Sequence, residues 1–136
     1  MFEHYLTPIR VYKLYIILFF NILFGQFASN VVHLDIISHS EKVEASIIFD
    51  EIIDRDDVSG WIDRDNYFTL SLFNVSLDNN NFSGKDYKYP LLSVEAADAG
   101  GSVQIIFNTA KKIDSYQLIR HAKDKNLLVI LNYSTK

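Results

Sequence analysis

The stretch GGSVQIIFNTAKKIDSYQLIRHAKDKNLLVILNY, residues 100–133, decides the fold class. Val103, Ile105 and Phe107 alternate with polar residues, which is the period-two pattern of a half-buried antiparallel strand. Two further apolar stretches, 115–122 and 127–133, are separated by the short polar breaks TAKKID and KDKN. We therefore expect three consecutive strands joined by two tight connections.

The same pattern continues back to residue 31. In 42–50, Val43, Ala45, Ile47 and Phe49 point one way, and 66–77 is a longer stretch rich in aromatic and β-branched residues. Regular spacing of this kind, without a helical period, predicts an all-β fold: an antiparallel two-sheet β-sandwich of about eight strands. The expected strands are 31–39, 42–50, 60–63, 66–77, 91–98, 102–109, 115–122 and 127–133.

The first twenty-five residues belong to another class. Arg10 and Lys13 precede the apolar run 14–25, which only Asn21 interrupts. This run is short for a membrane-spanning helix and suits the apolar core of a secretory signal. We expect residues 1–25 to form a signal helix, with a mature start near Gln26, and residues 26–136 to form the exported domain. The alternative is an uncleaved anchor, in which case 14–25 would be the chain's contact with the membrane.

Composition excludes several functions. The net charge of −4 argues against a nucleic-acid partner, which needs clustered Lys and Arg. The chain has no Cys, so disulfides and Cys-based zinc or redox sites are excluded. The acidic segment 50–57 lacks the spacing of a calcium loop and contains Arg55, so we expect neither a metal nor a cofactor. Ser residues occur in no nucleophile motif, and we expect no enzymatic activity.

Residues 31–134 resemble the AMIN domain, an exported β-sandwich module of cell-wall amidases and of secretins. The resemblance rests on YFTLSLFNV (67–75), GGSVQIIFNT (100–109), SYQLI (115–119) and NLLVILNY (126–133). It implies a non-catalytic module of the periplasm or cell envelope that binds peptidoglycan or an envelope protein complex. An accessory subunit of a pilus or secretin assembly without wall affinity is the alternative, and a small secreted enzyme is the third class.

The sequence departs from the AMIN pattern at four polar positions. Where the family has Arg, this chain has Tyr67 and Gln104; where the family has Asp, it has Ser71 and Asn108. A binding mode built on those charges is therefore not expected here. Aromatic residues with polar tips suit surfaces that meet sugar or protein, and we predict the binding residues to be Trp61, Tyr67, Tyr87 and Tyr89.

Overall fold

The computed structural model describes residues 29–77, 87–121 and 123–135, and the expected signal segment 1–25 lies outside them. Nine strands account for most of the described chain, together with one short 3₁₀ helix, η1 (Arg55–Asp57). The strands are β1 (Ser29–Ser38), β2 (Lys42–Phe49), β3 (Val58–Asp63), β4 (Tyr67–Phe73), β5 (Val75–Leu77), β6 (Leu91–Asp98), β7 (Ser102–Thr109), β8 (Ile113–Arg120) and β9 (Asn126–Tyr133).

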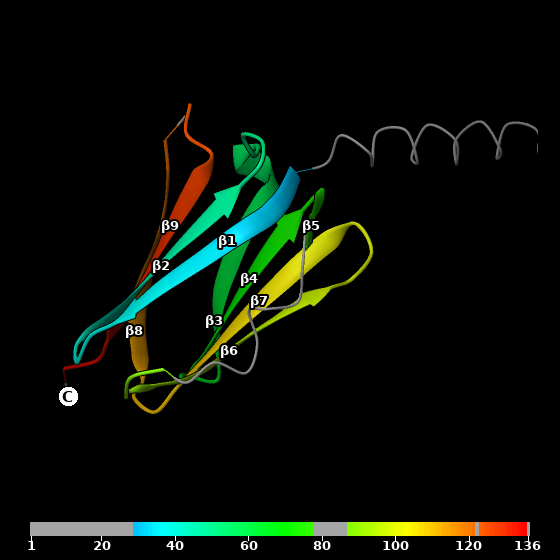
Figure 1. The fold of residues 1–136 in the computed structure, drawn as a ribbon. Coiled ribbons are helices and arrows are strands. Elements are labelled where there is room, and N and C mark those ends of the chain that lie inside the picture. The colour runs from blue at the N-terminus through cyan, green and yellow to red at the C-terminus, as the bar shows by residue number, and fades with distance from the viewer. Residues whose placement is uncertain (1–28, 78–86, 122, 136) are drawn as a thin grey trace, which may run out of the picture.

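The strands form two sheets packed face to face (Figure 1). One sheet has five strands in the order β5-β1-β2-β9-β8, and the other has four in the order β3-β4-β7-β6. All pairings are antiparallel except β1 with β5, which is parallel. The prediction of an all-β, two-sheet sandwich is confirmed. In the part of the chain that the structure describes, no helix has the length and apolar character needed to cross a membrane.

The core lies between the sheets and comes from alternate positions, as the sequence pattern predicts. Val43, Ala45, Ile47 and Phe49 of β2 are all buried, and each is separated from the next by a partly exposed residue. The inward side chains of β4, β7 and β9 meet them, with Phe68, Ile105 and Leu131 among those fully buried. Apolar burial of this kind is the main contribution to the stability of a sandwich without disulfides.

The stretch 66–77 is not one strand, contrary to the prediction. Asn74 has φ of 57° and ends β4, and the following residues cross to the other sheet as β5, where Ser29–Val31 pair with Val75–Leu77 in parallel. Because Asn enters the left-handed region more readily than most residues, it provides this turn. The spacing of the inward residues also changes here. Leu70 and Leu72 point inward before the turn at a spacing of two, and Val75, three residues after Leu72, points inward after it.

Two smaller boundaries also differ from the prediction. The strand expected at 60–63 begins at Val58, directly after η1, and the strand expected at 115–122 is Ile113–Arg120. In β1 the pairing with β2 shifts between Val31 and His33, so Val31 and Leu34, three residues apart, are both buried. Such a β-bulge adds one residue to a strand and reverses which side chains face inward.

Candidate functional site

The outer face of the four-stranded sheet carries exposed aromatic and apolar side chains. Trp61 is 44% exposed, Phe73 47% and Ile106 37%. Strand register aligns Trp61 of β3 with Thr69 of β4 and Ile106 of β7, so these three side chains form one row across the sheet. The indole and the isoleucine on this row are therefore directed at solvent and are not part of the core between the sheets.

The rest of this face is mostly uncharged and carries hydroxyl and amide groups, of which those of Thr69 and Ser71 on the central strand β4 are buried. Its remaining outward positions on the three strands β3, β4 and β7 hold Ser59, Asp63, Tyr67, Ser71, Ser102, Gln104 and Asn108. On β6 the corresponding positions include Glu95, opposite Ile106, and Ala97, opposite Gln104. Asp63 and Glu95 are the charged residues among these aligned positions. The face can therefore stack against an apolar ring and exchange hydrogen bonds with neutral groups.

The four positions that differ from the AMIN pattern lie together on this face. Tyr67 pairs directly with Asn108, and Ser71 pairs directly with Gln104. Each pair joins a position where the family has Arg to one where it has Asp. Directly opposed side chains in an antiparallel pair interact, and opposite charges there stabilise the sheet. In this chain both cross-strand pairs are neutral.

The predicted site residues Trp61 and Tyr67 share this face. Tyr67 lies opposite Asp63, two residues from Trp61 along β3, so the two rings are diagonal neighbours. The guanidinium of Arg64 lies 5.3 Å from the centre of the Tyr67 ring, within the range of a cation–π contact, and its Nε is 3.8 Å from a carboxylate oxygen of Asp63. Both aromatics therefore lie on strands, and neither occupies the core between the sheets.

The predicted residues Tyr87 and Tyr89 lie elsewhere. They precede β6 at the end of the sandwich, where the carbonyl of Lys88 accepts a hydrogen bond of 2.6 Å from the Ser38 hydroxyl. Tyr89 is 66% exposed, whereas Tyr87 packs partly against the core and burial raises its pKa. The structure thus brings together only Trp61 and Tyr67 of the four. Phe73 and Ile106 also lie on this face and were not predicted as site residues. The sequence signal for them was their position next to buried residues in strands whose side chains alternate between inward and outward.

Comparisons with known proteins add little to this description. No protein-family model and no curated protein matches the chain. Among solved structures, the chain is similar to heat shock protein 16.0 from Schizosaccharomyces pombe, with 18% sequence identity, a TM-score of 0.45, and coverage of 76% of this chain and 74% of that one. A superposition at this level carries no functional argument.

The residues that the structure describes offer no set of ligands for a metal ion. Residues 29–77, 87–121 and 123–135 contain no group of three or more His, Asp or Glu side chains placed to hold an ion. In the acidic segment, Asp54 instead caps η1, its carboxylate accepting the Asp56 N–H at 3.2 Å. The Asp50 carboxylate accepts hydrogen bonds from the backbone N–H of Asn30 at 2.7 Å and from its side-chain amide at 2.8 Å. These hydrogen bonds lower the pKa of the Asp50 carboxyl.

Proposed function

We propose that residues 26–136 are a non-catalytic binding module of the bacterial cell envelope, exported by the segment 1–25 and similar in role to AMIN domains. The observation that carries the proposal is the outer face of β3-β4-β7-β6, where Trp61, Phe73 and Ile106 are exposed among neutral polar side chains. Aromatic rings set among hydroxyl and amide groups suit the apolar faces and hydroxyls of sugar rings. Peptidoglycan glycan strands are therefore the ligand that we propose.

The two-sheet sandwich supports this proposal, because it is the fold that the AMIN resemblance implies. The arrangement of Tyr67, Ser71, Gln104 and Asn108 adds support, since the positions that carry the family motif are adjacent on the face that we propose for binding. Their neutral chemistry indicates that recognition uses stacking and neutral hydrogen bonds rather than ion pairs.

Pull-down with purified peptidoglycan sacculi tests the proposal. Trp61→Ala combined with Tyr67→Ala should weaken the apparent affinity for sacculi at least about tenfold, the effect of losing roughly 1.4 kcal/mol of binding free energy. Ile119→Ala is the matched control, because Ile119 is 36% exposed on β8 in the other sheet. Both variants must melt within a few degrees of the wild type. A double variant that folds and still binds sacculi as the wild type does would exclude the face.

The chain has a single Trp, so fluorescence of Trp61 reports directly on this face. A soluble chain of β-1,4-linked N-acetylglucosamine should change its emission in a saturable way. A different outcome is that the domain binds neither sacculi nor the oligosaccharide and instead captures a pilus or secretin protein through the same face. That result would replace wall binding by the alternative of an assembly subunit.

Export is tested separately by mass spectrometry of the protein recovered from the cell envelope. We expect a mature chain beginning near Gln26. Recovery with Met1 and the run 14–25 intact would show an uncleaved anchor in place of a cleaved signal.

A further inference from the structure

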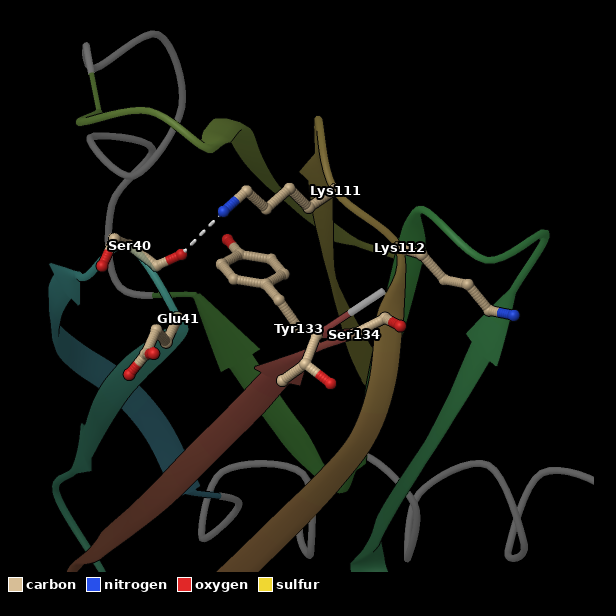
Figure 2. A pocket seen from close by; sticks show the side chains of 7 residues that line it. Ser40, Glu41, Lys111, Lys112, Tyr133 and Ser134 are labelled. Atoms are coloured by element: carbon tan, nitrogen blue, oxygen red, sulfur yellow. Dashed lines mark hydrogen bonds between the residues drawn. The ribbon is translucent and has the colours of Figure 1, made fainter.

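One end of the sandwich contains a pocket of about 430 Å³ that is separate from the aromatic face (Figure 2). It lies where the β1–β2 turn, the β7–β8 turn and the residues after β9 meet. Its lining consists of Ser40, Glu41, Lys111, Lys112, Tyr133, Ser134 and Thr135. This volume is within the range of small-molecule sites in proteins.

Hydrogen bonds join the three segments that form the walls. The backbone N–H of Tyr133 donates to the carbonyl of Glu41 at 3.0 Å, and the N–H of Ser134 donates to the carbonyl of Lys112 at 2.8 Å. The Lys111 ammonium crosses between the turns and donates to the carbonyl of Ser40 at 3.1 Å. These hydrogen bonds connect the three wall segments to one another.

The Tyr133 hydroxyl is the feature that points to a ligand. Tyr133 is only 5% exposed, and its hydroxyl is buried with no hydrogen-bond partner among the described residues. Figure 2 shows the ring between Ser40 and Lys111, with its hydroxyl on the side where Lys111 reaches Ser40. A buried unpaired hydroxyl costs free energy that a Phe at this position would avoid. Burial also raises the pKa of this Tyr to about 12, so the hydroxyl remains protonated and can donate.

The position of Lys111 favours a negative group beside the Tyr133 hydroxyl. The lining holds the cations Lys111 and Lys112 and the anion Glu41, and the Glu41 carboxylate is directed away from Tyr133 in Figure 2. An ammonium group has three donors, so Lys111 keeps two beyond its bond to Ser40. Lys112 is directed away from Tyr133 in Figure 2, so Lys111 is the cation close to the hydroxyl.

We propose that this pocket binds the carboxylate of a small organic acid or of a peptide end, with the Tyr133 hydroxyl and the Lys111 ammonium as its two donors. Charge-assisted hydrogen bonds of this kind are about twice as strong as neutral ones. The site is independent of the proposed glycan face, since the two share no residue. A peptide end and a sugar acid offer the same carboxylate, and the choice between them is experimental.

NMR titration of the purified 136-residue chain tests the site with two matched pairs of probes. N-acetylalanine is compared with its neutral amide, and glucuronate with glucose. At least one carboxylate should give saturable shifts at the amides of Lys111, Tyr133 and Ser134, while its neutral counterpart gives none. Saturation by N-acetylalanine alone identifies a peptide end as the source, and saturation by glucuronate alone identifies a sugar acid. Failure of both carboxylates overturns the proposal.

Three variants separate a binding role from a structural one. Tyr133→Phe should weaken carboxylate binding at least about tenfold and also raise the melting temperature without ligand, because it removes the unpaired hydroxyl. Lys111→Gln should weaken binding to a similar degree, whereas the matched Lys112→Gln should change it less than about threefold. Equal losses in both lysine variants, or unchanged binding in Tyr133→Phe, would contradict the proposed geometry. Trp61→Ala should leave this binding unchanged, so failure here and failure of the glycan face are distinguishable.

Discussion

Neighbouring residues on β7 lie in opposite environments, and this contrast sets what each position tolerates. Ile105 is completely buried between the sheets and pairs with Leu70 and Ala96, whereas Gln104 is exposed on the outer face and pairs with Ser71. Successive side chains of a strand point to opposite faces, so one residue of displacement separates the core from solvent.

Ile105→Asp should therefore unfold the domain, and Gln104→Asp should not. A carboxylate without a partner in the core costs several kcal/mol, on the order of the total stability of a small domain. At position 104 the same carboxylate stays in water, and a change within about 0.5 kcal/mol is expected. Thermal melts followed by circular dichroism check both. Equal losses for the two variants would show that the register of β7 is wrong.

A single backbone conformation determines how β4 and β5 are divided between the sheets. The left-handed φ at Asn74 turns the chain out of one sheet, and the Asn74 N–H donates to the carbonyl of Gly101 at 2.9 Å. The residues of 66–77 on both sides of Asn74 are good strand formers, so strand propensity alone predicts one continuous strand. The signal for the turn is the spacing of the inward apolar residues, which is two from Leu70 to Leu72 and three from Leu72 to Val75.

Asn74→Val should destabilise the domain by about 1–2 kcal/mol or more, because the left-handed region is costly for a residue with a branched Cβ. Asn74→Gly is the matched variant: it also removes the side chain but adopts the required φ freely. Urea denaturation of the two variants compares the backbone effect directly. If Asn74→Gly loses as much stability as Asn74→Val, the side chain of Asn74, and not its conformation, holds the turn.

The contact between Asp50 and Asn30 joins the end of β2 to the start of β1 and makes stability depend on pH. Hydrogen bonds from Asn30 lower the pKa of Asp50 below its ordinary 3.8. A lowered pKa in the folded state means that the stabilisation is complete above the unfolded-state value and is lost as the pH falls through the folded-state value. Because Asp50 is exposed, we expect at most about 1 kcal/mol.

Asp50→Asn should lower the melting temperature slightly at about pH 6 and bring it closer to the wild type at about pH 2.5. The amide is similar in size to the carboxyl group but cannot accept both N–H groups of Asn30. Asp35→Asn, at an exposed position on β1, controls for the change in net charge. A difference between Asp50→Asn and the wild type that stays the same from pH 6 to pH 2.5 would contradict this linkage.

At the scale of the whole molecule, the sequence was sufficient for the sandwich but only partly for the site. Alternation identified the inward residues of β2 and β7, because burial on one face of a sheet imposes a period of two. The sequence predicts Trp61 and Tyr67 as binding residues but not their relative position. The β3–β4 register shows that they are diagonal neighbours. The end pocket was not predicted, since its walls come from segments about 70 and 20 residues apart in sequence.

The two proposed sites differ in charge, which predicts different responses to salt within one molecule. The aligned outward positions of β3, β4, β7 and β6 include only Asp63 and Glu95 as charged residues, so glycan binding there should change less than about threefold between roughly 0.05 and 0.5 M NaCl. Carboxylate binding beside Lys111 should weaken over the same range, because salt screens an exposed ammonium. Titrations of the same preparation, followed by Trp61 fluorescence for the glycan and by NMR for the carboxylate, compare the two. A glycan affinity that falls as steeply as the carboxylate affinity would show that recognition at the aromatic face depends on ion pairs, contrary to the neutral side chains of Tyr67, Ser71, Gln104 and Asn108.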